Sequence, residues 1–158
     1  MTNLTQNTPR TFFGTPPPGS LRALPASANT KYYEGAALMK DATTGALISC
    51  TPTASGKFAG FSNEYKDNLT GSVYGGTAAS TTVEVVTEGC VDLTVAKAGA
   101  FGRGDEDTVY CSDDDTFTTS AGTNNIVVGK IVFVPEAAVG ATSAVVRVKF
   151  EASANRSI

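Results

Sequence analysis

Residues 81–119 read TTVEVVTEGCVDLTVAKAGAFGRGDEDTVYCSDDDTFTT, and this stretch decides the fold class. Apolar side chains recur at every second position, namely at Val83, Val85, Val91, Leu93 and Val95. A two-residue period is that of a half-buried β-strand, and no helical period competes with it. Because Glu88-Gly89 is a turn signal, we expect residues 82–95 to form a hairpin.

Strand patterns also follow along the rest of the chain, separated by Gly, Pro, Asn and Asp. They cover residues 37–39, 46–50, 56–61, 109–110, 116–119, 126–134 and 144–151. About nine short strands without a convincing helix predict an all-β chain that forms a small antiparallel β-barrel or sandwich. We expect Phe58 in the core.

Two of these strands make specific predictions about faces. Residues 126–134 (IVVGKIVFV) are almost continuously apolar, which predicts a strand covered on both faces, with Gly129 as a candidate bulge. In residues 144–151 the side chains of Val146, Val148 and Phe150 alternate with those of Val145, Arg147 and Lys149. Residues 62–80 are polar and are expected to form a long loop.

The first 33 residues differ from the rest of the chain. They contain five of the seven prolines, three basic residues and no acidic residue, for a net charge of +3, whereas residues 34–158 carry −6. Prolines favour an extended conformation, so we predict an N-terminal arm over residues 1–33 and a β-barrel or sandwich body over residues 34–158. A disordered tail is the alternative. The adjacent Phe12 and Phe13 favour an arm that docks on an acidic neighbour. The predicted contact residues are Arg10, Phe12, Phe13, Arg22 and Leu24.

Six acidic residues are concentrated in the predicted turns on either side of the strand at residues 109–110. They are Asp105, Glu106, Asp107, Asp113, Asp114 and Asp115. Calcium binds clustered carboxylates, but the spacing lacks the alternation of a helix-flanked calcium loop, so a solvated turn is the better interpretation. A third interpretation is an acidic rim on which the basic arm of a neighbouring copy docks.

Composition excludes several functions. The chain has no histidine and no tryptophan, which excludes His-based triads and the common zinc sites, and we predict no enzyme activity, no cofactor and no metal. A pI near 4.9 without a basic stripe argues against direct nucleic-acid binding.

The apolar runs are too short to cross a bilayer, so we expect no membrane contact. Without a recognisable secretory signal, the three cysteines Cys50, Cys90 and Cys111 are expected to be reduced.

The order of several segments resembles the decoration, or cement, proteins of tailed-phage heads. The resemblance covers roughly residues 34–151 and rests on Gly35 onwards, GKFAG at 56–60, the Val-rich residues 82–95, GDEDTVYCSDDDTF at 104–117 and IVVGK at 126–130. It implies a structural virion protein with a small β-barrel body, often a trimer, on the outside of the capsid. Its partners would be the major capsid protein and other copies of itself, and it would cement neighbouring capsid subunits and stabilise the head.

The alternative function is a fibre or surface module that recognises a glycan or a host protein through the loop carrying Tyr65 and Tyr74. Charged residues make up only 17% of the chain, against about 25% in a typical domain. A low charge suits a protein whose surface is covered by partners, and it equally suits a β-protein with Thr and Ser on its open faces.

Overall fold

The computed structural model describes residues 3–14, 17–53 and 55–154, so Pro16 of the predicted arm lies outside the described residues. Within them the chain forms thirteen strands and one short 3-10 helix, which confirms the all-β prediction. The strands are β1 (Thr11–Phe13), β2 (Leu21–Pro25), β3 (Thr30–Tyr32), β4 (Ala37–Lys40), β5 (Leu47–Ser49), β6 (Lys57–Ser62), β7 (Lys66–Asn68), β8 (Thr82–Val86), β9 (Glu88–Ala96), β10 (Thr108–Cys111), β11 (Phe117–Thr118), β12 (Ile126–Phe133) and β13 (Ser143–Glu151). The helix, η1 (Glu136–Ala138), lies in the expected connector between β12 and β13.

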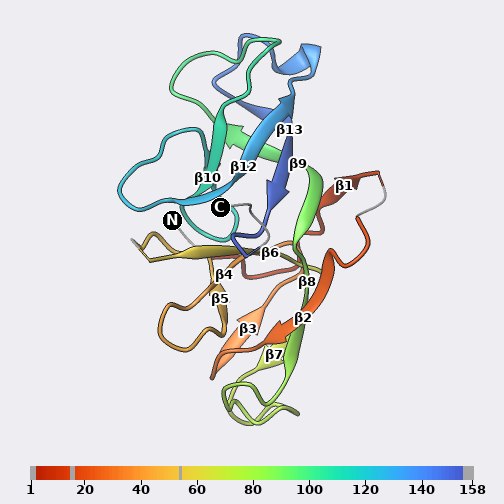
Figure 1. The fold of residues 1–158 in the computed structure, drawn as a ribbon, viewed down its shortest axis with the longest axis vertical. Helices are drawn as coiled ribbons and strands as arrows, with labels where there is room; N and C mark the ends of the chain where they lie inside the picture. The colour runs from red at the N-terminus through yellow and green to blue at the C-terminus, as the bar shows by residue number, and fades with distance from the viewer. Residues whose placement is uncertain (1–2, 15–16, 54, 155–158) are drawn as a thin grey trace.

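The C-terminal half of the chain forms a closed five-stranded barrel, which is the upper part of Figure 1. Its strand order is β9-β11-β10-β12-β13, and β13 closes the barrel by pairing with β9 from Glu88 to Ala96. The pairs are antiparallel except β11 with β9, which is parallel. The barrel prediction is therefore confirmed, with one parallel pair that the sequence did not indicate.

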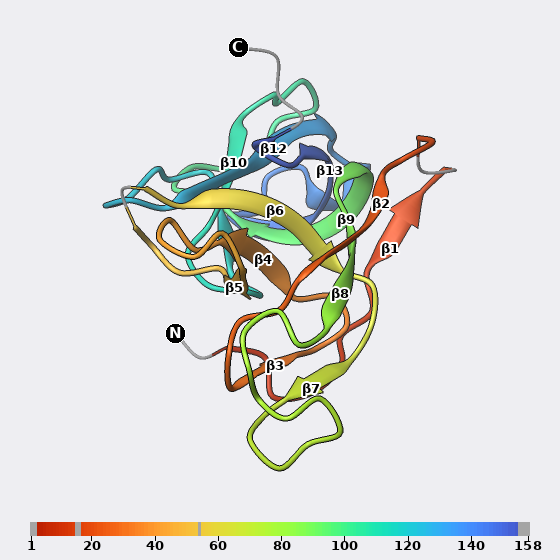
Figure 2. The same ribbon diagram turned by 60° about the horizontal axis from the view of Figure 1, so that its bottom comes forward.

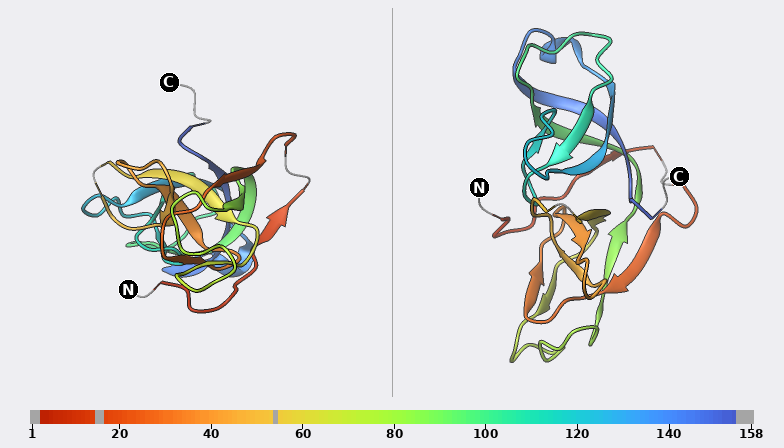
Figure 3. Two further views of the ribbon diagram at one scale, coloured as in Figure 1. Left: turned by 90° about the horizontal axis from the view of Figure 1, so that it is seen from below. Right: turned by 60° about the vertical axis from the view of Figure 1, so that its left-hand side comes forward.

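A second sheet lies below the barrel, with the order β2-β8-β6-β4-β5, and the β3–β7 ribbon lies beyond it (Figure 3, right). The predicted hairpin of β4 and β5 and the hairpin of β10 and β11 are both present. β6 lies beside the barrel strands β12 and β13, as Figure 2 also shows. The second sheet therefore covers one side of the barrel with β6, and β4 adds Ala37 and Met39 to the same core.

The predicted hairpin over residues 82–95 is wrong. β8 pairs with β2 and β6 in the second sheet, whereas β9 pairs with β1, β11 and β13 in the barrel. Glu88 and Gly89 lie inside β9, and the chain passes from one sheet to the other at Thr87. The bend is fixed on both sides, because the Thr87 N–H donates to the Ser20 carbonyl at 2.7 Å and the Thr87 carbonyl accepts from the Ala152 N–H at 2.7 Å.

The prediction of a separate arm over residues 1–33 is also wrong for the described residues. Three parts of this segment are strands paired with later strands of the same chain: β1 with β9, β2 with β8, and β3 with β7. Ala26 and Tyr32 are fully buried, and Tyr32 donates its hydroxyl to the Leu47 carbonyl at 2.6 Å. Residue 33 is therefore no structural boundary, and the first strands complete sheets that the rest of the chain leaves open.

The main core combines buried side chains of the barrel strands β9–β13 with those of β4, β6 and β8 of the second sheet, and it is rich in phenylalanine. Phe61 makes edge-on contacts with Phe58 and Phe150, with ring centroids 5.5 and 5.0 Å apart. Phe58 is 1% exposed, which confirms its predicted core position. Burying one such ring stabilises the fold by about 2–3 kcal/mol. A second apolar cluster, which includes Tyr32, Leu38 and Val85, lies on the opposite side of the second sheet.

Three other predictions need correction. β12 is covered on one face only, because Val132 and Phe133 are 48% and 53% exposed. The long loop contains a strand, β7, whose three polar residues carry no strand signal. Cys50 and Cys111 form a disulfide, and only Cys90 among the described cysteines is a free thiol.

Candidate interaction surface

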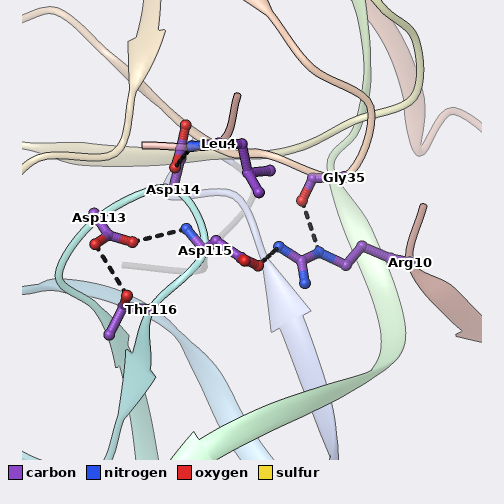
Figure 4. Close-up of polar contacts among 7 residues, drawn as sticks. All are labelled: Leu4, Arg10, Gly35, Asp113, Asp114, Asp115 and Thr116. Atoms are coloured by element: carbon purple, nitrogen blue, oxygen red, sulfur yellow. Dashed lines mark hydrogen bonds and ion pairs between the residues drawn. The ribbon is translucent and has the colours of Figure 1, made fainter. Parts of the chain in front are cut away.

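The N-terminal segment, residues 3–13, contacts the aspartate-rich turn between β10 and β11 of its own chain (Figure 4). Arg10 Nη2 lies 2.5 Å from Asp115 Oδ1. The backbone N–H of Leu4 donates to Asp114 Oδ1 at 2.8 Å. One interpretation of the sequence was a contact between a basic arm and an acidic rim of a neighbouring copy. In the structure, the basic segment contacts the acidic turn within one chain.

Arg10 is an anchor of the fold. Its side chain is 10% exposed, and its Nε donates to the Gly35 carbonyl at 2.7 Å (Figure 4). The guanidinium carbon lies 5.3 Å from the ring centre of Phe117 and 5.8 Å from that of Phe61. A planar cation that stacks on rings and donates to two acceptors is well satisfied. Arg10 is therefore not accessible as the predicted capsid contact.

Asp113 and Asp114 hold the turn from within. Asp113 accepts hydrogen bonds from the Asp115 N–H and the Thr116 hydroxyl, both at 2.9 Å (Figure 4). Asp114 is 1% exposed, and its burial raises the pKa of that carboxyl, a rise that the N–H of Leu4 partly opposes. The turn interpretation is confirmed, but the expectation that its carboxylates are solvated is wrong for these two residues.

The other acids of the predicted rim form a separate group around Lys97. Lys97 Nζ lies 2.6 Å from Asp105 Oδ2 and 2.7 Å from Asp107 Oδ2. The ammonium of Lys97 and the N–H of Gly102 hold the pKa of Asp105 below its ordinary value. Glu106 is exposed. The six acids thus do not form one docking rim, since five of them bind groups of their own chain.

The five predicted contact residues of the arm separate into two kinds. Phe12 packs against the main core, and Leu24 packs against the second cluster. Phe13 is 61% exposed, and Arg22 is exposed as well. With Arg10 held as described above, only Phe13 and Arg22 present their side chains to a partner.

Phe13 belongs to an exposed surface on the outside of the barrel, which we call the outer aromatic face: Phe13, Asp92, Phe133, Val145 and Arg147. Arg147 lies at its centre and makes a two-pronged ion pair with Asp92, with N···O distances of 2.9 and 3.2 Å. The guanidinium carbon lies 3.8 Å from the ring centre of Phe13 and 5.7 Å from that of Phe133.

Strand pairing explains why these side chains meet. Arg147 is the direct partner of Asp92 across β9–β13 and of Phe133 across β12–β13, while β1 adds Phe13 on the far side of β9. Val145 is two residues before Arg147 on the same face of β13 and is 52% exposed. Aromatic and arginine side chains are enriched at protein interfaces. The outer aromatic face therefore has the composition of an interface core.

A second exposed group lies on either side of β7 in the sequence. Tyr65, Tyr74 and Val73 line one open hollow of about 510 Å³, and Val73 is 96% exposed. Tyr65 also packs against Tyr33, with ring centres 5.5 Å apart, and the Lys66 ammonium lies 4.9 Å from the Tyr74 ring centre. The two tyrosines that the sequence analysis singled out are thus brought together.

Sequence reasoning missed Phe133 as a surface residue. The signal was present, because residues 126–134 place apolar side chains on both faces of one strand, and we assigned a covering layer to each face. In the structure the second face of β12 is open. An exposed apolar strand face without a covering layer is typical of a partner surface.

Compared with protein-family models and with curated proteins, the sequence matches no family and no curated relative. No helix in the part of the chain that the structure describes is long and apolar enough to span a membrane.

Proposed function

We propose that this chain is a structural virion protein that binds the outside of a phage capsid and cements neighbouring major capsid subunits. The observation that supports this most directly is the outer aromatic face, in which Phe13, Phe133 and Val145 expose half or more of their side chains around one ion pair. The order of sequence motifs supports the same proposal through its resemblance to head decoration proteins. In this proposal the protein has no catalytic role.

The outer aromatic face suits stable attachment because it is already ordered. Phe13 is held by the pairing of β1 with β9, and Arg147 is fixed by both oxygens of Asp92. Rings with few rotatable bonds, held before binding, lose little conformational entropy on association. Such a face binds a capsid surface without the ordering cost of a disordered arm.

We further propose that the protein binds as a homotrimer. Three equivalent outer faces attached to one body raise the effective concentration of each attachment after the first, so modest single contacts add up to firm binding. Neighbouring capsid subunits would then be linked through one rigid β-body.

The test mixes purified protein with expanded, undecorated heads and measures occupancy by sedimentation and electron microscopy. The variant Phe13→Ala/Phe133→Ala removes the two rings, and Tyr74→Ala is the matched control, since it removes an exposed ring from the distal loop. We expect the double variant to lose binding by at least about tenfold and the control to bind like the wild type. Equal binding by the double variant and the wild type would contradict the proposal.

A second candidate function is glycan recognition by the Tyr65–Tyr74 hollow. Exposed tyrosine rings beside carboxylates suit sugars, which stack on aromatic faces and donate hydroxyls to acidic oxygens. Glu64 and Asp67 line the same hollow. Binding on a glycan array that disappears in Tyr65→Ala and Tyr74→Ala, but persists in the Phe13/Phe133 variant, would favour this function over capsid binding.

A further inference from the structure

A cluster of basic residues surrounds a cavity on the second sheet, away from the outer aromatic face. Lys40 of β4 and Lys57 of β6 are direct cross-strand partners. Directly opposed side chains of an antiparallel pair have their Cβ atoms about 5 Å apart, and like charges in this position destabilise the sheet. Arg22 of β2 adds a third positive charge to the same cavity.

These three cations have no counter-charge in the described part of the chain. None of them takes part in the ion pairs formed there, although most of the other basic residues do. Arg22 makes one long hydrogen bond, from Nε to the Gly19 carbonyl at 3.3 Å. Three unpaired cations around one cavity generate a local positive potential in a chain whose net charge is −3.

The cavity itself has an apolar floor. Its volume is about 300 Å³, and its lining includes the buried Phe58, Ala59 and Ala152 together with the half-buried Leu24. A bare inorganic anion would satisfy the charges but would leave the exposed part of Leu24 in contact with water. A neutral apolar molecule would cover the floor but would not neutralise the charges. The cavity therefore matches a ligand that combines both features.

We propose that this cavity is a binding site for a carboxylate carried on a short apolar stem, with the carboxylate between Lys40, Lys57 and Arg22 and the stem against Leu24. A free alkyl carboxylate and the end of a polypeptide with an apolar last residue both present this chemistry. The site lies apart from the outer aromatic face and goes beyond the proposed function, since it requires no capsid for its occupancy.

The experiment is a titration of the full chain followed by heteronuclear NMR at low salt, with octanoate as the probe. We expect amide shifts confined to residues around the cavity, and weaker binding as salt is raised. Octanol and inorganic phosphate test the stem and the charge separately, and each is expected to bind at least about tenfold more weakly than octanoate. Two tripeptides ending in isoleucine, one with a free carboxylate and one amidated, show whether a polypeptide end binds more tightly than octanoate.

Two double variants isolate the role of the lysine pair. Lys40→Gln/Lys57→Gln is expected to weaken octanoate binding about tenfold. It should fold at least as stably as the wild type, because it removes a repulsion. Lys130→Gln/Lys149→Gln is the matched control, since these lysines are also direct cross-strand partners but do not line the cavity. This control is expected to bind octanoate like the wild type.

Several results would overturn this assignment. They are the absence of octanoate-dependent shifts at the cavity, equal affinity for octanol and octanoate, and an equal loss of affinity in the two double variants. None of these depends on heads or on Phe13, so a failure here is distinguishable from a failure of the proposed capsid function.

Discussion

The adjacent residues Phe12 and Phe13 provide a test of how the N-terminal segment is used, because they point to opposite faces of β1. Phe12 packs into the main core, with its ring 5.9 Å from that of Phe150 and 6.4 Å from that of Phe61. Phe13 is 61% exposed and contacts the Arg147 guanidinium. Replacing each by alanine removes the same atoms from two different environments.

The expected costs differ several-fold. Truncating a fully buried phenylalanine costs about 3–5 kcal/mol, and because Phe12 is only half-buried we expect Phe12→Ala to lower the free energy of unfolding by about 2–3 kcal/mol. Phe13→Ala removes an exposed ring, so its cost should stay below about 1 kcal/mol. With a urea m-value of about 2 kcal/mol/M, the midpoint falls by about 1–1.5 M for Phe12→Ala and by less than about 0.5 M for Phe13→Ala.

The assay is equilibrium unfolding in urea followed by far-UV circular dichroism, because the chain has no tryptophan to report by fluorescence. Binding to heads is measured on the same two proteins. Phe13→Ala should fold normally and bind less, whereas Phe12→Ala should bind normally wherever it remains folded. If both substitutions leave the midpoint within about 0.25 M of the wild type, residues 11–13 do not pack on the body and the reasoning fails.

Three further predictions concern stability. Replacing Cys50 by serine opens the 61-residue loop that its disulfide to Cys111 closes. The free energy of unfolding should fall by about 4 kcal/mol. It is measured by unfolding in urea, with the reduced wild type as the control. Burial raises the pKa of Asp114, so ionisation of this carboxyl lowers the stability of the folded protein as the pH rises through that pKa. Asp114→Asn should therefore raise the free energy of unfolding by up to about 1 kcal/mol at pH 7 and leave it unchanged below about pH 4. Thermal unfolding across this pH range measures the difference. A Cβ on Gly129 would lie 1.9 Å from the Lys149 carbonyl oxygen, so Gly129→Ala should cost about 3 kcal/mol in urea unfolding, and a wild-type midpoint would contradict the close approach of β12 and β13.

The apolar patterns, together with the turn residues between them, were sufficient to predict the fold class and nine of the thirteen strands. The four strands that were missed are β1, β2, β3 and β7. β2 reads LRALP and β7 reads KDN, and neither sequence shows the two-residue period or a β-branched residue. These segments become strands because partners far along the chain offer open edges, and no local pattern reports such partners.

The false hairpin over residues 82–95 has a different cause. The buried residues Val83, Val85, Val91, Leu93 and Val95 all have odd numbers, so one alternation runs through the supposed turn. A continuous strand with a bend produces such an uninterrupted two-residue period. The prediction was wrong because it gave the turn signal Glu88-Gly89 more weight than this period. The cysteine pairing failed for a simpler reason, since spacing in an odd set of cysteines does not reveal which two strands lie side by side.

The outer aromatic face was predictable only in part. The sequence placed Val145 and Arg147 together on one face of the last strand and marked Phe13 as a contact residue. It did not bring them to one place, because that requires β1 beside β9 and β12 beside β13. Contacts between segments more than 100 residues apart follow from topology, and the sequence established the fold class without establishing the strand order.

The course of the N-terminal segment bears on how this protein would hold a partner. Residues 11–13 pair antiparallel with β9 and residues 21–25 pair antiparallel with β8, and the carbonyl of Ser20 accepts from the Thr87 N–H at the bend between β8 and β9. The segment thereby covers two strand edges that would otherwise offer unpaired backbone groups to other chains. Its conformational entropy is lost when the protein folds, so none remains to oppose binding through Phe13. A detached arm would bind with an affinity reduced by the conformational entropy that it loses on ordering. The paired segment instead presents a surface that is already ordered before binding. The free energy of the contacts at the outer aromatic face is therefore not reduced by the cost of ordering the segment.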